Sequence, residues 1–245
     1  MHGFVGGAGA RYFGDMARFE AVLFDKDGTL LDFHGTWDGA TGVALRAAAS
    51  DAWDLAVAAR LLGFDLTTDR IKAGSPMLAE ANDVLLDLVA DHIDVAVFEQ
   101  TIGSAAMQSI QPARGAVAVL DALQDEGVAC AVVTNDWASV TTGQLAALGL
   151  HDRFVTVVGS DSGFGAKPDP AMVFGALAAI GVEPSCALLV GDTSHDIRAG
   201  QAAGVSTALV TNGSVPDAAT AVLADFVITT LDELIPILTG PSHPL

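Results

Sequence analysis

Short apolar runs alternate with longer segments of helical period over most of the chain after Met16. The apolar runs predict strands at residues 21–24, 129–134, 155–158, 187–190 and 207–210, and a weaker strand at 226–228. Between them, apolar residues three and four positions apart predict helices near residues 115–126, 140–148, 170–180 and 197–203. This alternation predicts the α/β class, with a doubly wound parallel sheet.

One stretch, from about residue 31 to residue 111, breaks the alternation. It contains no convincing strand, and three segments show helical spacing, at 53–62, 77–90 and 95–110. An insertion of this size directly after the first strand predicts a small α-helical domain over the carboxyl edge of the sheet. We therefore expect a core domain of residues 18–31 and 112–240, an inserted helical domain of residues 32–111, and a disordered or extended segment at residues 1–17.

The charge of the chain limits its partners. Its 245 residues hold 11 Lys and Arg against 30 Asp and Glu, a formal charge of −19, which repels nucleic acid and anionic membranes at long range. An acidic protein that handles an anionic substrate has to gather positive charge locally, in a metal ion or in one or two cations. No apolar run reaches the roughly 18 residues that a spanning helix needs.

The cysteines and the first residues indicate a compartment. Cys130 and Cys186 both lie in apolar runs without a CxxC pair, so we expect free thiols and a reducing cytoplasm. The first residues are rich in glycine and lack the basic head and apolar core of a signal peptide. Both observations favour a cytoplasmic protein.

The sharpest chemical signal follows the first predicted strand, where residues 25–29 read Asp-Lys-Asp-Gly-Thr. Open α/β sheets bind their ligands at the carboxyl ends of strands. Residues two apart in an extended segment point to the same side, so Asp25 and Asp27 can face one small volume, whereas Lys26 is expected to point away. Gly28 lets the chain turn and lets its amide approach an anion. Because Asp and Gly are also common turn residues, this motif alone leaves an ordinary turn open.

Polar residues follow two later strands as well. Thr134 and Asn135 end the second core strand and can donate hydrogen bonds to phosphoryl oxygens, although both residue types also cap helices. Lys167 is one of three lysines in the chain and stands on a loop that opens a helix. In so acidic a chain we interpret it as functional rather than as a solvated surface group.

A second pair of acids follows the apolar run at residues 187–190. Asp192 and Asp196 would join Asp25 and Asp27 at the same edge of the sheet. Four carboxylates in one place repel one another unless a cation is present, and an all-oxygen cluster suits Mg²⁺.

Together, these strand ends carry Asp and Asp, then Thr and Asn, then Lys, then Asp and Asp. The set resembles the haloacid-dehalogenase-like (HAD) hydrolase superfamily, whose motifs read DxDGT, Ser or Thr, Lys, and GDxxxD, and the likeness extends over residues 19–238. The inserted helices resemble the small α-helical cap that this superfamily places on its Rossmannoid core. The chain is most similar to the phosphoglycolate-phosphatase-like branch.

The resemblance implies an enzyme that hydrolyses a small, phosphoglycolate-like phosphorylated metabolite through an aspartyl-phosphate intermediate, with Mg²⁺ as cofactor. By this likeness Asp25 would be the nucleophile, and Asp27 would protonate the leaving alcohol and then activate water. Thr134 and Lys167 would hold the phosphoryl oxygens.

The resemblance also implies a metal site and further substrate contacts. The metal would be bound by the side chains of Asp25 and Asp192 and by the backbone carbonyl of Asp27, with Asp196 in support. The remaining contacts would come from an amide each of Gly28 and Asn135.

In the cap, the loop at residues 70–76 resembles the substrate-specificity loop of helical caps. Lys72 on this loop would meet a second anionic group of the substrate, or else be a solvated lysine. His34 and Trp37 are candidates for lining the substrate pocket, and Trp37 is an equal candidate for the core of the cap.

Related activities have to be weighed against this interpretation. A haloacid dehalogenase lacks the second aspartate, and a phosphonate hydrolase replaces it with alanine, so Asp27 opposes both. A sugar phosphomutase keeps both acids and stays open, as does a catalytically silent binding protein. The oligomeric state, monomer or homodimer, also stays open.

Overall fold

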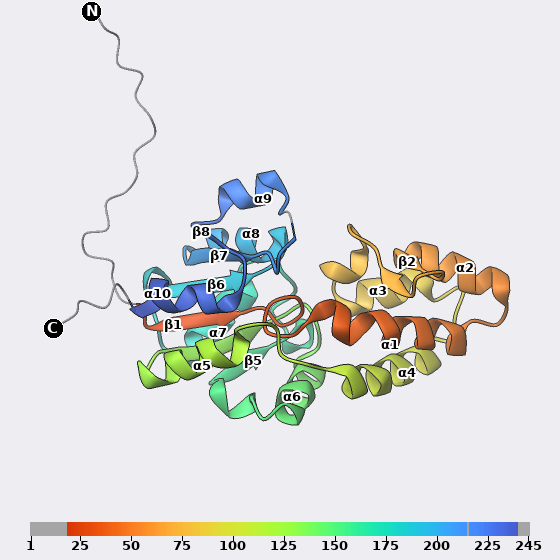
Figure 1. The fold of residues 1–245 in the computed structure, drawn as a ribbon, viewed down its shortest axis with the longest axis horizontal. Helices are drawn as coiled ribbons and strands as arrows, with labels where there is room; N and C mark the ends of the chain where they lie inside the picture. The colour runs from red at the N-terminus through yellow and green to blue at the C-terminus, as the bar shows by residue number, and fades with distance from the viewer. Residues whose placement is uncertain (1–18, 215, 240–245) are drawn as a thin grey trace, which may run out of the picture.

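The computed structural model describes residues 19–214 and 216–239, so the segment at residues 1–17 lies outside the described residues. Within them, six parallel strands form one sheet in the order β5-β4-β1-β6-β7-β8 (Figure 1). These strands are β1 (Ala21–Phe24), β4 (Ala129–Val133), β5 (Thr156–Val158), β6 (Ala187–Gly191), β7 (Ser206–Val210) and β8 (Phe226–Ile228). All six predicted strands are confirmed, with ends that shift by at most one residue.

Helices cover both faces of the sheet because successive strand residues point to opposite sides. The core helices are α5 (Ala116–Asp125), α6 (Ala138–Ala147), α7 (Ala171–Ile180), α8 (Ser194–Ala203), α9 (Ala218–Leu223) and α10 (Leu234–Thr239). Val22 and Phe24 of β1 pack in one apolar cluster with helices α5, α6 and α10, whereas Leu23 packs in a second cluster with α7 and α8. The predicted doubly wound α/β core is therefore confirmed.

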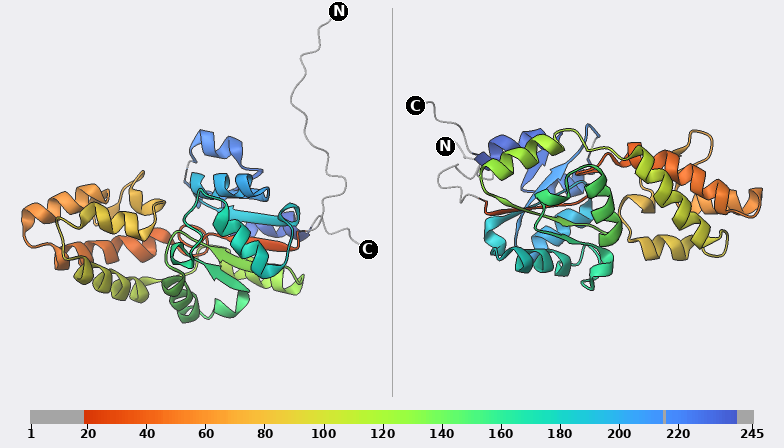
Figure 2. Two further views of the ribbon diagram at one scale, coloured as in Figure 1. Left: turned by 180° about the vertical axis from the view of Figure 1, so that it is seen from behind. Right: turned by 90° about the horizontal axis from the view of Figure 1, so that it is seen from below.

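A helical cap lies beyond the carboxyl ends of the strands (Figures 1 and 2). It consists of helices α1 (Phe33–Ala48), α2 (Ala52–Leu61), α3 (Asn82–Val89) and α4 (Val95–Ser109), with the two-residue strands β2 (Phe64–Asp65) and β3 (Arg70–Ile71). The cap has an apolar cluster of its own, which includes Leu45, Leu62 and Phe98. Such separate clusters are typical of separate folding units, and the domain limits at residues 31/32 and 111/112 stay a prediction.

The cap differs from the expected pattern in three places. Strands β2 and β3 pair antiparallel, although no strand was expected there. Helix α1 is absent from the predicted helices because three glycines interrupt its sequence and weaken its helical signal. The single helix predicted at residues 77–90 is wrong, since Ser75 caps a short 3₁₀ turn at Pro76–Leu78 that ends before α3 begins.

Two chain segments connect the core to the cap, and they run side by side. Leu31 forms an antiparallel bridge with Pro112, and the amide of Asp32 donates to the carbonyl of Gln111 at 3.1 Å. The cap is therefore attached through one narrow pair of chain segments, directly next to the end of β1. No helix among residues 19–214 and 216–239 is long and apolar enough to cross a membrane.

Candidate active site

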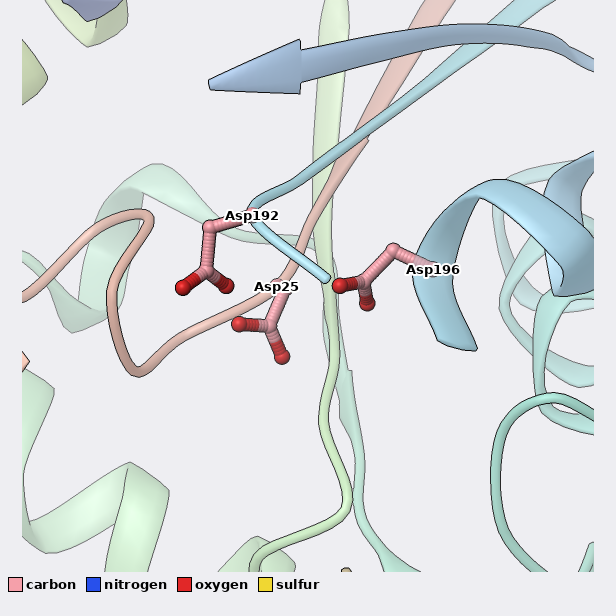
Figure 3. Close-up of side chains that lie close together, drawn as sticks. All are labelled: Asp25, Asp192 and Asp196. Atoms are coloured by element: carbon pink, nitrogen blue, oxygen red, sulfur yellow. The ribbon is translucent and has the colours of Figure 1, made fainter. Parts of the chain in front are cut away.

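Three carboxylates meet where β1 and β6 end (Figure 3). Asp25 follows β1, Asp192 follows β6, and Asp196 projects from the first turn of α8. Because β1 and β6 are paired neighbours in the sheet, their ends bring these acids together. One oxygen atom from each carboxylate lies within 4.8 Å of the others.

Two glycines permit this close approach. Gly28 has a φ of +81°, and a Cβ atom there would lie 2.1 Å from Oδ2 of Asp192. At Gly191 a Cβ atom would lie 2.2 Å from Cγ of Asp196. Any side chain at either position would push a carboxylate out of the cluster, which explains why glycine accompanies the acids in both motifs.

A buried lysine sits directly against the acids. The ammonium of Lys167 donates to Oδ1 of Asp25 at 2.6 Å, to Oδ1 of Asp196 at 2.6 Å and to the carbonyl of Val133 at 2.7 Å. Burial alone would lower the pKa of Lys167, but the carboxylates of Asp196 and Asp25 raise it. The lysine therefore stays positively charged inside the site.

The acids carry more negative charge than this lysine balances. Burial raises the pKa of Asp25 to about 7. The charge of Lys167 lowers this pKa, and the charge of Asp196 raises it. Burial also raises the pKa of Asp192 well above its ordinary value, and the charges of Asp25 and Asp196 raise it further. Clustered carboxylate oxygens in need of positive charge are the donor set that Mg²⁺ prefers, so these residues fit the ion.

Asp27 lies beside this cluster, in contact with the cap. Nε1 of Trp37, on α1, donates to Oδ1 of Asp27 at 2.6 Å. The ammonium of Lys26 lies 2.9 Å from Oδ2. Burial nevertheless raises the pKa of Asp27, and the nearby carboxylate of Asp136 adds to the rise. The raised pKa favours the protonated form of the Asp27 carboxyl group.

Lys26 does not line the cavity, but the expectation that it contributes only its backbone is wrong. Strand β1 ends at Phe24, so the alternation of a strand no longer orients residue 26. The fully buried Lys26 side chain contacts Asp27 and also donates to Asp136 and to Gln144 at 2.6 Å. Asp136 was missed by sequence reasoning, although its place two residues after Thr134 in the same strand-end loop was an available signal.

The carboxyl edge of the sheet also carries Thr134, Asn135 and Gly28. Their contacts in the structure are with the protein itself. Thr134 is buried and faces the cavity above the acids. Asn135 accepts from the amide of Lys167 at 2.8 Å and donates to its carbonyl at 3.1 Å, so it positions the lysine loop. The amide of Gly28 donates to the carbonyl of Leu31 at 3.0 Å and so shapes the loop, and its predicted role in binding an anion stays a prediction.

The predicted cap residues separate into two groups. Trp37 lines a cavity of about 150 Å³ between cap and core, and it also packs against the apolar cluster of the cap. His34 is exposed, pairs with Asp38 at 3.1 Å, and borders a different, open groove. Lys72 is exposed and lines neither hollow. His195 of α8 also lines the cavity, and its Nδ1 lies 3.3 Å from the carbonyl oxygen of Ala79.

The structure thus gathers acids at a parallel sheet edge beneath a helical cap, the arrangement that the motifs predicted. The family model for haloacid dehalogenase-like hydrolases matches residues 22–210, and the chain belongs to this family. It is 31% identical over 211 residues to the phosphoglycolate phosphatase of Caulobacter vibrioides, which covers 84% of this chain and 85% of that protein. It is 30% identical over 212 residues to the N-acetylmuramic acid 6-phosphate phosphatase of Pseudomonas aeruginosa, with 81% and 84% coverage.

A solved structure has the same fold. The crystal structure of a predicted phosphoglycolate phosphatase from Haemophilus somnus aligns with a TM-score of 0.70 at 22% identity, over 91% of this chain and 99% of that one. The resemblance inferred from the motifs is therefore confirmed. The chain is a phosphoric monoester hydrolase of the phosphoglycolate-phosphatase-like branch.

Proposed function

We propose that the protein is a Mg²⁺-dependent phosphatase that hydrolyses a small phosphorylated metabolite through a phosphoenzyme on Asp25. One observation carries the proposal: Lys167 holds an oxygen of Asp25 at 2.6 Å where Asp25 faces the cavity. A carboxylate fixed in this way is oriented for attack on a bound phosphoryl group. The raised pKa of Asp27, which faces the same cavity, supports its part as the acid.

In the first step, a carboxylate oxygen of Asp25 forms a bond to phosphorus while the bond from phosphorus to the substrate alcohol breaks. Asp27 gives its proton to the departing oxygen, so that the product leaves as a neutral alcohol. Lys167 and the hydroxyl of Thr134 bind the phosphoryl oxygens, where negative charge is concentrated.

In the second step, Asp27 takes a proton from a water molecule as the water oxygen bonds to phosphorus. The bond between phosphorus and Asp25 breaks, inorganic phosphate leaves, and the carboxylate of Asp25 is regenerated. Asp27 thus carries one proton in each direction during a turnover, as microscopic reversibility requires.

The carboxylates of Asp25 and Asp192, with Asp196 in support and the backbone carbonyl of Asp27, are the proposed ligands of Mg²⁺. When bound, the ion supplies positive charge that lowers the repulsion between an anionic nucleophile and an anionic phosphate. The free thiols of Cys130 and Cys186 suit a reducing cytoplasm.

Hydrolysis of 4-nitrophenyl phosphate tests this proposal. We expect turnover with Mg²⁺, loss of turnover with a chelator, and a loss on the order of 10⁴-fold in Asp25→Asn. The exposed cap residue Asp87, changed to Asn, is the matched control and should keep full activity. Full activity in Asp25→Asn, with a thermal transition like that of the parent, would contradict the assigned nucleophile.

A further inference from the structure

The cavity between cap and core has an apolar wall on the cap side. Side chains from α1, the 3₁₀ turn, α3 and α4 form this wall, and they include Trp37, Met77, Leu78, Leu85, Leu86 and Ile102. The opposite wall is the acidic strand edge with Asp25, Thr134 and Lys167. A phosphoryl group bound at the strand edge therefore directs the rest of its molecule toward the apolar wall.

This cavity offers no free cation for a second anionic group. Lys167 is the only lysine or arginine in the lining among the described residues, and its ammonium already contacts two carboxylates and one carbonyl. The imidazole of His195 directs Nδ1 to the carbonyl of Ala79. Acids also line the cavity, among them Glu80 and Glu99.

Nearby cations outside the lining either pair with carboxylates or lie away from this cavity. Arg46 pairs with Asp69 at 2.6 Å, and Arg70 lies 3.3 Å from Asp38. Lys72 is exposed and lines neither hollow. Arg114 lines the open groove that Asp192 also borders.

We infer that the preferred substrate is the phosphate monoester of an uncharged, largely apolar alcohol, and that a carboxylate next to the ester, as in 2-phosphoglycolate, is selected against. The inference rests on the proposed function and deepens it. A carboxylate that enters an apolar pocket without a partner loses its hydration and gains nothing in return. An apolar group gains by leaving water at the same wall.

The first test compares two substrates of similar size, one with a neutral amide and one with an anionic carboxylate next to the ester. We expect kcat/KM for the phosphate ester of glycolamide to exceed that for 2-phosphoglycolate by at least about tenfold, because only the second brings a carboxylate to the apolar wall. In a series of ethyl, n-butyl and n-hexyl phosphates, kcat/KM should rise by up to about fourfold per methylene until the cavity is filled. Equal or higher kcat/KM for 2-phosphoglycolate would overturn the inference.

The second test changes the charge of the wall itself. Glu99→Lys places an ammonium on the cap side of the cavity, and we expect it to shift the kcat/KM ratio of the two glycolate esters by about tenfold toward 2-phosphoglycolate. Asp87→Lys makes the same change of charge on an exposed cap position outside the lining, and its ratio should stay within about twofold of the parent. Glu99→Gln should shift the ratio in the same direction by less. Equal shifts in Glu99→Lys and Asp87→Lys would overturn the assignment of this wall.

The outcomes separate this inference from the proposed function. If no phosphate ester is hydrolysed with Mg²⁺, the proposed function fails. If esters are hydrolysed through Asp25 and 2-phosphoglycolate is still preferred, the proposed function stands and only the inferred substrate class fails.

Discussion

The strand edge and the cap wall enclose the same cavity with opposite chemistry. At the strand edge, the positions of Asp25 and Asp192 follow from paired parallel strands and two glycines, and Asn135 positions the loop of Lys167. The cap wall is apolar and is built from helices that pack on a separate cluster. In the proposed mechanism, the phosphoryl group common to all substrates binds at the first surface, and the variable alcohol binds at the second.

The two surfaces differ in how strongly the substitution of one residue affects its neighbours and the activity. A charge at the strand edge has partners within 3 Å, so removing one group leaves another uncompensated in a buried place. At the cap wall, neighbouring apolar side chains share the contact with a substrate, so one substitution alters preference rather than turnover. Activity should therefore respond steeply to core variants and gradually to cap variants.

The largest effect is expected for Lys167→Met, which removes the cation from the strand edge and keeps a side chain of similar length. We expect kcat to fall by on the order of 10³-fold, because the developing phosphoryl charge loses its partner. The free energy of unfolding should fall by about 3–5 kcal/mol near neutral pH, since Asp25 and Asp196 then face each other without a cation. Steady-state kinetics and urea denaturation measure both quantities.

Lys72→Met is the matched control for this variant. It removes an ammonium from an exposed loop of the cap, so both kcat and stability should stay close to those of the parent. A comparable loss of kcat in Lys72→Met would contradict the assignment of turnover to the charged groups of the strand edge.

The acidic cluster should make stability without metal decrease as pH rises. The pKa of Asp25 is raised from 3.8 to about 7 by burial, so between these values the folded state binds more protons than the unfolded state. The stabilisation is complete below pH 4 and is lost as pH rises through about 7. We expect the metal-free protein to melt at a lower temperature at pH 8 than at pH 5, with a flatter dependence in Asp25→Asn.

Added Mg²⁺ should reverse this trend, because the ion binds deprotonated carboxylates. Its effect on the melting temperature is expected to be larger at pH 8 than at pH 5. A metal-free protein that becomes steadily more stable from pH 5 to pH 8, with no difference in Asp25→Asn, would contradict the described electrostatics of the cluster.

A smaller effect is expected where the two surfaces touch. Trp37→Phe removes the N–H group that contacts Asp27 at 2.6 Å and keeps an aromatic ring in the wall. We expect kcat to fall by up to about tenfold with alkyl phosphates, and less with aryl phosphates, whose leaving groups need less protonation. The exposed Trp53, changed to Phe, should leave both rates unchanged.

The strand edge was largely predictable from the sequence because its chemistry follows from local patterns. An apolar run predicts a buried strand, parallel strands end at one edge, and the polar residues after Phe24, Val133 and Gly191 therefore meet. The contact between Lys26 and Asp136 was not predictable by this rule, since the alternation of a strand does not orient side chains in the loops that follow β1 and β4. Their contact joins positions 110 residues apart.

The cap was less predictable because tertiary contacts override its helical pattern. A continuous helix was expected from residue 77 to residue 90, yet the 3₁₀ turn at Pro76–Leu78 stops before α3, and Ala79 between them meets Asn135 of the core at 2.8 Å. Periodicity identifies which faces of a helix are apolar, but not which face borders a cavity. Of the two alternatives left open for Lys72, a substrate contact or a solvated lysine, the exposed side chain outside the cavity lining favours the second.

The most direct test of the covalent mechanism uses Asp27→Asn with 4-nitrophenyl phosphate. This ester releases its leaving group without an acid, whereas hydrolysis of the phosphoenzyme still needs the base that the variant lacks. We predict a burst of one nitrophenolate per enzyme, followed by very slow release, with the phosphoryl group found by mass spectrometry on the peptide that contains Asp25. Slow release from the start, or a burst with the phosphoryl group on another residue, would contradict the central claim.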